Sequence, residues 1–377
     1  MTTAIPLAVP SFDEEEERAV LDVVRSRWLT MGPRVERFEE AFAEAVGTPH
    51  AVMTSSCTTA LHLTFAALGI GPGDEVIVPS LTFVATANAA TYTGADVRFA
   101  DITSLEQPIM SAEATEAQIG PRTAAICVVH FAGYVPDMEP FRRLAERHSL
   151  ALIEDAAHAP GATAHDGAAA GSLADAGCFS FFSNKNLVTG EGGMITTADS
   201  SLAAKARTLR AHGMTATTWD RDRGHASGYD VIERGYNYRP TEVEAALGLV
   251  QLGKLPAMNE RRRALVGRYR ELLPARAGRV PFADGDADSR SACHILPFVC
   301  DEAGDRDRIR TAASGRGVQT SVHYSPVHGF TTFDAAAPPL PVTEAFSARE
   351  VTLPLHPGMT DDDVAVVADV VSSATPA

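Results

Sequence analysis

The chain has 377 residues, of which 45% are hydrophobic and 21% are charged, as in ordinary globular proteins with an apolar core. Its 32 basic and 48 acidic residues give a formal net charge of −16, which argues against a nucleic-acid backbone or an anionic membrane surface as the main partner. Because no apolar run reaches the length of a membrane span and the N-terminus lacks the features of a signal peptide, we expect a cytoplasmic protein.

The cysteines indicate neither a metal site nor a disulfide framework. None of the five stands in a Cys-x-x-Cys pair, and they lie far apart along the chain, mostly in apolar runs. We therefore expect buried, reduced thiols in a cytosolic protein, and no bound metal.

The first half of the chain alternates between strand and helix patterns. Ser11 and Glu14 form a capping-box pattern that predicts a helix over 14–27, and an amphipathic helix follows up to Val46. Further helices are expected over 55–68, 82–92 and 138–148, and strands over 50–53, 75–78, 97–101, 124–129 and 151–155. The run 124–129 is apolar throughout, as in strands that are buried on both faces. This alternation predicts an α/β fold with a mostly parallel sheet sandwiched by helices.

The character of the sequence changes in its last third. Strands over 179–182 and 194–197 and helices over 200–211 and 240–255 complete the alternation, and the last of these helices is expected to end near Pro256. A charged helix over 261–273, short strands over 291–299, 317–322 and 351–355, and a final helix over 361–371 follow. We therefore expect a large domain over residues 1–255 and a smaller α+β C-terminal domain over residues 256–377.

A lysine stands between two of the predicted strands. Lys185 follows the apolar run that ends at Phe182, and a glycine-rich turn over 190–193 leads into the next strand. Burial disfavours the charged form of a lysine and lowers its pKa, which suits an amine that forms a Schiff base. The alternative is a solvated lysine in a surface loop.

Asp155 ends a predicted strand 30 residues before Lys185. Ligands of open α/β sheets bind beyond the carboxyl ends of the strands, so a carboxylate at this position is a candidate functional group. The alternative is an aspartate that caps a helix. The separation leaves room for one connection and one strand, which allows both side chains to reach the same edge of the sheet.

Together these groups match what pyridoxal phosphate requires. Asp155 would keep the pyridine nitrogen protonated, and Lys185 would hold the aldehyde as a Schiff base and then serve as a general base. The phosphate needs an anion site, which Ser180 and the helix N-terminus at Cys57 and Thr58 would provide. Taken alone, that N-terminus also fits a plain Ser/Thr cap.

Eight stretches of the chain form recognisable motifs. They include Glu-Asp-Ala-Ala-His at 154–158 and Phe-Ser-Phe-Phe-Ser-Asn-Lys-Asn-Leu at 179–187. The other stretches are 28–39, 55–61, 71–83, 189–193, 235–239 and 353–358. Through these stretches the chain resembles, nearly from end to end, the DegT/DnrJ/EryC1/StrS group of sugar aminotransferases, within the fold-type-I pyridoxal-phosphate enzymes. The resemblance implies an aspartate-aminotransferase-like large domain.

The resemblance also implies roles for residues that hold the cofactor. Lys185 would form the Schiff base, Asp155 would pair with the pyridine nitrogen, Phe83 would stack on the ring, and His158 would lie beside the ring hydroxyl. The phosphate would be held by Cys57, Thr58, Ser180 and, from the neighbouring subunit, Asn237.

The same resemblance implies a homodimer with shared active sites and a set of substrate contacts. Arg239 is a candidate for the carboxylate of the amino donor, and His323, Tyr324 and His328 match a segment on the substrate side. For His328, a polar loop residue of the small domain is the alternative.

Two positions bear on how far the resemblance extends. The family usually has glycine where Cys57 stands, and a cysteine is tolerated there provided that its φ is not positive. Lys185 is retained where dehydratase relatives carry histidine, which favours transamination over dehydration.

Three functional hypotheses follow. The first is a transaminase that moves an amino group from glutamate or glutamine to a keto sugar, a nucleotide-linked 4-keto or 3-keto deoxysugar of antibiotic or surface-glycan biosynthesis. The second is amination of a keto-cyclitol such as an inosose. The sequence barely separates these two: arginines in the loop 219–225 could meet a diphosphate, as in a nucleotide-linked sugar, but a solvated charge run explains them at least as well. The third is a non-catalytic protein that binds the cofactor or a sugar.

Overall fold

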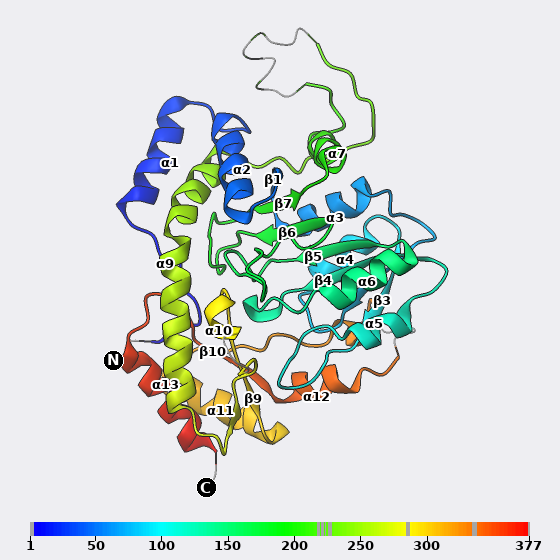
Figure 1. The fold of residues 1–377 in the computed structure, drawn as a ribbon. Coiled ribbons are helices and arrows are strands. Elements are labelled where there is room, and N and C mark those ends of the chain that lie inside the picture. Colours follow the sequence, from blue (N-terminus) through cyan, green and yellow to red (C-terminus); the bar gives the residue numbers. More distant parts are fainter. Residues whose placement is uncertain are drawn as a thin grey trace.

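The computed structural model describes residues 4–216, 219, 222, 224, 228–283, 287–333 and 338–375. At its centre lies a seven-stranded sheet with the order β1-β7-β6-β5-β4-β2-β3 (Figure 1). All neighbours pair in parallel except β7, which runs antiparallel to both β1 and β6. The prediction of a mostly parallel α/β sheet is therefore confirmed. The strands are β1 His50–Thr54, β2 Glu75–Pro79, β3 Asp96–Ala100, β4 Thr123–Val129, β5 Ala151–Asp155, β6 Ala176–Ser180 and β7 Gly193–Thr197.

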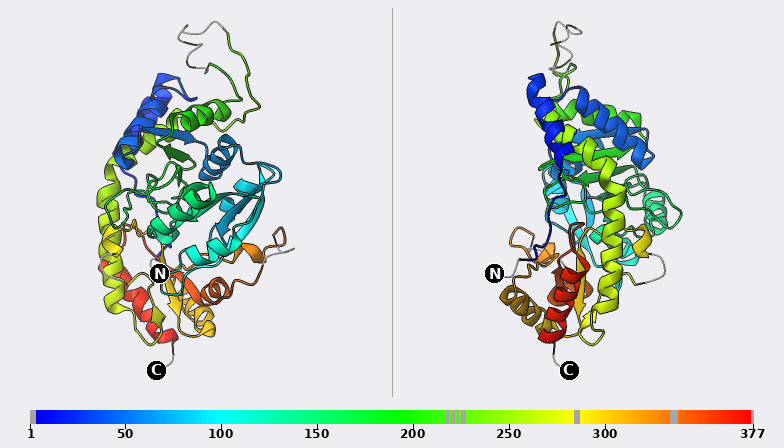
Figure 2. Two further views of the ribbon diagram at one scale, coloured as in Figure 1. Left: turned by 45° about the vertical axis from the view of Figure 1, so that its right-hand side comes forward. Right: turned by 90° about the vertical axis from the view of Figure 1, so that its left-hand side faces the viewer.

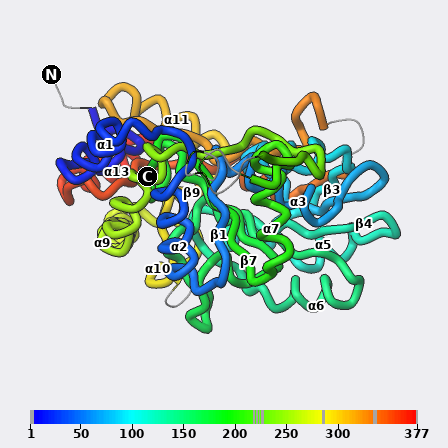
Figure 3. The backbone as a smooth tube through the Cα atoms, turned by 90° about the horizontal axis from the view of Figure 1, so that it is seen from above, coloured from blue at the N-terminus to red at the C-terminus, as the bar shows by residue number. Residues whose placement is uncertain are grey.

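Helices cover both faces of this sheet. Side chains alternate between the two faces along each strand, and because the strands are apolar on both faces, each face needs a layer of helices. In β2, Val76 and Val78 join the apolar cluster beneath one group of helices, whereas Ile77 joins the cluster on the opposite face. The first face carries α3 (Cys57–Ala67), α4 (Ala85–Thr91) and α7 (Ser200–Arg210), and the second carries α2 (Pro33–Val46) and α6 (Glu139–His148). A short helix, α5 (Ala112–Gln118), lies against β3 and α6. Viewed from above, α1, α2 and α9 gather at one end of the molecule and α5 and α6 at the other (Figure 3).

Helix α9 spans the height of the molecule as one continuous element, Glu242–Leu272, with Pro256 inside it (Figure 2). The prediction that this helix ends near Pro256 is wrong. A proline removes one backbone donor from a helix, but packing compensates: α1 (Glu14–Ser26) and α2 contact α9 on one side of the molecule, and α13 (Asp361–Ala374) also packs on it. The predicted domain boundary at residue 255 falls within this helix and stays a prediction. Within the described residues, no helix is both long and apolar enough to cross a bilayer.

The C-terminal part contains a three-stranded antiparallel sheet in the order β10-β9-β8. The predicted strand over 291–299 begins only at Leu296, and the one over 317–322 forms just single bridges, from Val318 to Ile5 and from Ser321 to Thr352. The helices α11 and α12 were not predicted. The elements are β8 Gly278–Arg279, β9 Leu296–Cys300, β10 Glu350–Leu353, α10 Ala287–Arg290, α11 Ala303–Gly315 and α12 Pro341–Arg349, with 3₁₀ turns at Phe131–Gly133 and Val327–Gly329.

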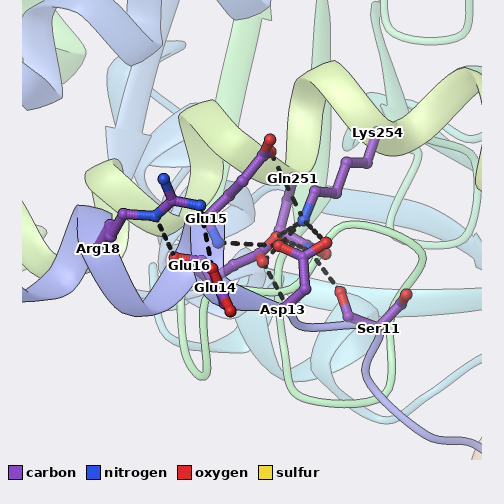
Figure 4. A network of polar contacts seen from close by, with 8 residues as sticks. All are labelled: Ser11, Asp13, Glu14, Glu15, Glu16, Arg18, Gln251 and Lys254. Carbon is purple, nitrogen blue, oxygen red and sulfur yellow. Dashed lines mark hydrogen bonds and ion pairs between the residues drawn. The ribbon is translucent and has the colours of Figure 1, made fainter.

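Helix α1 is fastened to α9 by a polar network (Figure 4). The capping box consists of Asp13 and Glu16, two residues later than predicted from Ser11 and Glu14: the Glu16 carboxylate accepts the Asp13 N–H at 2.9 Å, and the Asp13 carboxylate also accepts the Glu15 N–H at 2.8 Å. The Lys254 ammonium on α9 lies 2.8 Å from carboxylate oxygens of both Asp13 and the buried Glu16. Burial alone would raise the pKa of Glu16, but the Lys254 ammonium and further hydrogen bonds lower it below its ordinary value. The network thus anchors an otherwise mostly exposed helix.

Candidate active site

A cavity of about 380 Å³ opens where the parallel strands of the large sheet end. The segments that follow β1, β2, β5 and β6 all reach it, as expected for a ligand site of an open α/β sheet. Nine residues singled out from the sequence line it: Cys57, Thr58, Phe83, Asp155, His158, Ser180, Lys185, His323 and Tyr324.

Lys185 lies in the connection between β6 and β7, where its backbone N–H donates to the Phe182 carbonyl at 2.9 Å. The buried phenylalanines before it, Phe179 and Phe181, pack among the aromatic side chains of α2 and fix the start of the turn. Burial lowers the pKa of Lys185 to about 8, although the nearby Cys57 and Asp155 oppose this shift. A substantial fraction of its amine is therefore neutral near pH 8.

Asp155 ends β5 with its side chain almost fully buried. The Thr86 hydroxyl donates to Oδ2 at 2.7 Å, and the Ala157 N–H donates to Oδ1 at 3.2 Å. Burial raises the pKa of Asp155, and these two hydrogen bonds counteract the rise. Among the described residues no cation forms an ion pair with this carboxylate. A protonated pyridine nitrogen would provide the missing positive partner, so this end of the cavity fits pyridoxal phosphate.

The N-terminus of α3, which also lines the cavity, can receive an anion. Ser56 caps α3 by accepting the Thr59 N–H at 3.2 Å, and the N–H groups of Cys57 and Thr58 belong to the first turn, which has no acceptors within the helix. The Ser180 hydroxyl lines the same cavity. Helix N-termini of this kind bind phosphate, so this part of the cavity also fits the cofactor.

Cys57 sits in this anion site without backbone strain. It begins α3, and its φ is not positive. A cysteine is therefore tolerated at this position, where the resembling family usually has glycine. Its side chain is buried in the apolar cluster beneath α3, and burial raises the pKa of the thiol well above its ordinary value. Cys57 is therefore a neutral packing residue that also lines the cavity.

Gly193 brings α3 close to the sheet. A Cβ atom at this first position of β7 would lie 2.4 Å from the backbone carbon and oxygen of Ser56 and 2.6 Å from the nitrogen of Cys57. Glycine is thus required by the close approach of two backbones. The nearby Gly190 and Gly192 have φ of +91° and +149°, which fits the tight turn expected from the sequence.

The C-terminal part closes the cavity with His323 and Tyr324. The Tyr324 hydroxyl lies 3.0 Å from Nε2 of His158, whose Nδ1 is buried without a hydrogen-bond partner. Burial lowers the pKa of His158 well below its ordinary value, and that of His323 to about 4. Both rings are therefore neutral at physiological pH. The unpaired Nδ1 of His158 is a polar atom that a bound ligand can satisfy.

The aromatic ring of Phe83 lies at the cavity with 58% of its surface exposed. Its centroid is 6.1 Å from that of Tyr324. An apolar ring left this exposed beside a cavity offers a surface for a planar ligand.

Three predicted site residues do not line the cavity of their own chain. Asn237 is exposed and pairs through its backbone with Ala211, and Arg239 is partly exposed. The His328 ring has partners at both nitrogens, the Ser80 hydroxyl at 2.6 Å from Nδ1 and a Glu344 oxygen at 3.3 Å from Nε2. The arginines of the loop 219–225 lie outside the described residues.

Sequence reasoning missed Thr86 and His294. Thr86 lies inside α4, where its hydroxyl gives no local signal of a partner 69 positions away. His294 lies 3.5 Å from the Lys185 amine, measured from ring Nε2 to Nζ. A polar ring in the apolar run before β9 is a signal that could have drawn attention to it.

Known proteins are similar to this chain over nearly its whole length. Residues 10–372 match the model of the DegT/DnrJ/EryC1/StrS aminotransferase family. The chain is 41% identical over 375 residues to the spore coat polysaccharide biosynthesis protein SpsC of Bacillus subtilis (strain 168), with 96% of this chain and 94% of that protein covered.

Two solved structures are similar over nearly the whole chain. The aminotransferase TlmJ from Streptoalloteichus hindustanus is 34% identical, with 99% of both chains covered and a TM-score of 0.91. DesI, solved in the presence of its TDP-sugar product, is 33% identical, with 99% of this chain and 94% of the other covered and a TM-score of 0.88.

Proposed function

The chain belongs to the DegT/DnrJ/EryC1/StrS aminotransferase family and is a pyridoxal-phosphate-dependent aminotransferase, and we propose that it transfers an amino group from glutamate or glutamine to a keto sugar. The observation that carries this proposal is the convergence of Lys185, Asp155 and the N-terminus of α3 on one cavity. A sugar acceptor is supported by the relatives, among them a polysaccharide biosynthesis protein.

Each residue of the site has a proposed task. When bound, pyridoxal phosphate supplies a ring that withdraws electrons from the carbon being deprotonated. Asp155 stabilises a protonated ring nitrogen, and the Lys185 amine takes a proton from one position and returns it to another. The Ser180 hydroxyl and the N–H groups of Cys57 and Thr58 hold the phosphate. Phe83 packs on the ring, and His158 lies beside the ring hydroxyl.

The acceptor is proposed to be a nucleotide-linked 4-keto or 3-keto deoxysugar. DesI, one of the similar structures, was solved in the presence of its TDP-sugar product, which supports an acceptor sugar that is linked to a nucleotide. On the substrate side, His323 and Tyr324 lie at the cavity, and His328 is kept as a candidate contact further out. A keto-cyclitol such as an inosose is the second candidate acceptor. Antibiotic or surface-glycan biosynthesis is the proposed setting.

A homodimer is proposed in which Asn237 of each chain completes the other chain's phosphate site, with Arg239 beside it for the donor carboxylate. Asn237 is exposed on its own chain, and Val231 and Ile232 nearby expose more than half of their surfaces, which a partner could cover. Mixed dimers of Lys185→Ala and Asn237→Ala chains test this: sharing leaves one intact site, so about half of the parent activity is expected. Inactive mixed dimers would show that Asn237 acts within its own chain.

The proposed setting is the cytoplasm. All five cysteines are free and buried, as predicted, which supports a reducing compartment.

The function is tested with purified protein loaded with cofactor. The parent should be yellow, lose its colour on treatment with borohydride, and also bleach with an amino donor. The Lys185→Ala variant should stay folded and lose turnover by on the order of 10²–10⁴-fold. A panel of nucleotide-linked keto sugars and inososes, monitored for return of the yellow colour, identifies the acceptor. A parent that binds the cofactor but responds to no amino donor would favour the non-catalytic alternative.

A further inference from the structure

His294 lies directly beside the reactive amine although no sequence motif assigned it a role. It precedes β9 in the C-terminal part, is 4% exposed, and places Nε2 3.5 Å from Lys185 Nζ. The centroid of the His158 ring lies 4.3 Å from that of His294, and the Arg262 guanidinium donates to the His294 backbone carbonyl at 3.1 Å. The ring is thus fixed from several elements.

A chain of hydrogen bonds determines which nitrogen of His294 carries the proton. The Asn259 amide nitrogen donates to the Pro160 carbonyl at 2.9 Å, so its other atom, which faces Asn186, is the oxygen. The Asn186 amide nitrogen donates to that oxygen at 2.8 Å and to the Ala292 carbonyl at 2.7 Å. Backbone carbonyls only accept hydrogen bonds, so neither amide can be turned around without losing a partner.

The remaining atom of Asn186 is therefore its oxygen, 3.0 Å from Nδ1 of His294. An amide oxygen only accepts, which requires a hydrogen on Nδ1. Burial, followed by the nearby Lys185, His158, Arg262 and His323, lowers the pKa of His294 well below its ordinary value, so the ring is neutral. A neutral imidazole carries one N–H, and Nε2 is consequently a bare acceptor that faces the lysine.

We propose that His294 is a positioning residue for Lys185: its Nε2 accepts a hydrogen bond from the free Lys185 amine and so directs the nitrogen lone pair into the cavity. A neutral amine has two hydrogens and one lone pair, and donating one hydrogen sideways leaves the lone pair free to take a proton. This assignment rests on the proposed role of Lys185 as the base.

The first test examines the tautomer without measuring activity. Nitrogen-15 labelling of the 12 histidines and a two-bond proton–nitrogen NMR spectrum distinguish Nδ1–H from Nε2–H rings. The His294 signals are assigned by their absence from the His294→Gln spectrum. We expect a neutral ring with the proton on Nδ1 at pH 7–8. A proton on Nε2, or a doubly protonated ring, would overturn the proposal.

The second test compares His294→Leu, His294→Gln and, as a matched exposed control, His165→Gln, all loaded with cofactor. The half-reaction with glutamate is followed as loss of the yellow colour. We expect His294→Leu to lower the maximal rate about tenfold or more with little change in glutamate affinity or cofactor content. His294→Gln, whose amide oxygen can reach the place of Nε2, should recover part of the rate, and His165→Gln should match the parent.

The outcomes separate the two proposals. The positioning role would be overturned if both His294 variants reacted at the rate of the parent. It would also be overturned if both variants lost cofactor to the same extent. In either case the parent still turns over, so the proposed function stands. A parent that responds to no donor would refute the proposed function instead. If one His294 variant does not fold, the spectrum of the other assigns the His294 signals, and the tautomer of the parent still decides the proposal.

Discussion

At the scale of single residues, burial pushes the two central groups of the site toward their uncharged forms. It lowers the pKa of Lys185 to about 8 and raises that of Asp155. For the lysine this produces a usable base. For Asp155 it works against the charge needed to hold a protonated ring nitrogen. The Thr86 hydroxyl, 2.7 Å away, is the group that lowers the pKa of Asp155 most, ahead of the Ala157 N–H and of the nearby Lys185 and His130. A threonine outside every motif thus supports the cofactor partner.

Thr86→Val tests this support, since it keeps the shape of the side chain and removes the hydroxyl. A hydrogen bond to a charged group contributes about 1.5–3 kcal/mol, so the dissociation constant of the cofactor should rise tenfold or more. Thr91→Val, at an exposed position of the same helix, is the control and should leave it unchanged. Measurement is by titration of the apo protein with pyridoxal phosphate. Equal constants in the parent and Thr86→Val would show that Asp155 stays charged without this donor.

At the scale of elements, the site depends on how closely α3 approaches β7. The N-terminus of α3 serves as an anion site only if its first turn faces the ends of β5 and β6, and Gly193 lets the two backbones meet there. The glycine-rich turn therefore acts through packing, and its backbone is not itself assigned to the phosphate.

Gly193→Ala should separate these two elements. The added Cβ meets only backbone atoms, which cannot rotate away, so we expect a loss of stability of about 1–3 kcal/mol and weaker binding of inorganic phosphate to the apo protein. Gly253→Ala in α9 has open space around it and should be neutral or slightly stabilising. Urea unfolding and phosphate protection against heat measure the two effects. Unaltered phosphate protection in Gly193→Ala would argue against the α3 site.

At the scale of the whole molecule, the cavity is completed only where the C-terminal part folds back on the sheet. Glu350 on β10 fixes the segment of the C-terminal part that carries His323 to the cavity: it accepts the His323 N–H at 2.8 Å and the Thr352 hydroxyl at 2.5 Å while being fully buried. Burial raises its pKa to about 8, although these hydrogen bonds and two nearby arginines, Arg306 and Arg310, oppose the rise.

This carboxyl should make the stability of the protein fall as pH rises. Between its ordinary pKa of 4.5 and about 8, the folded state binds a proton that the unfolded state has released. The slope is up to about 1.4 kcal/mol per pH unit, and it vanishes above pH 8. Glu350→Gln should therefore flatten the pH dependence between pH 6 and 8, whereas Glu113→Gln, which is exposed, should not. Parallel curves for the parent and Glu350→Gln in urea unfolding would contradict the protonated state.

The sequence by itself determined the features that local pattern encodes. Apolar runs of strand length, capping residues and glycine turns located the strands of the large sheet and most of its helices, although the strand predicted over 179–182 is Ala176–Ser180 in the structure. The end of a strand pointed to Asp155, and a lysine between two apolar strands pointed to Lys185; their roles in the site stay predictions. The strands and helices were predicted correctly where the apolar period is a property of neighbouring residues. The continuation of α9 through Pro256 was mispredicted because long-range packing outweighed a local breaker.

Only the tertiary structure decided which distant groups act on the reactive ones. Thr86 reaches Asp155 across 69 positions, and His294 reaches Lys185 across 109. The proton on His294 is fixed by Asn186 and by Asn259, which lies on α9. The direction of a hydrogen bond depends on three-dimensional geometry, which the spacing of residues along the sequence does not contain. The sequence therefore located the lysine, and the folded chain determined how its amine is held.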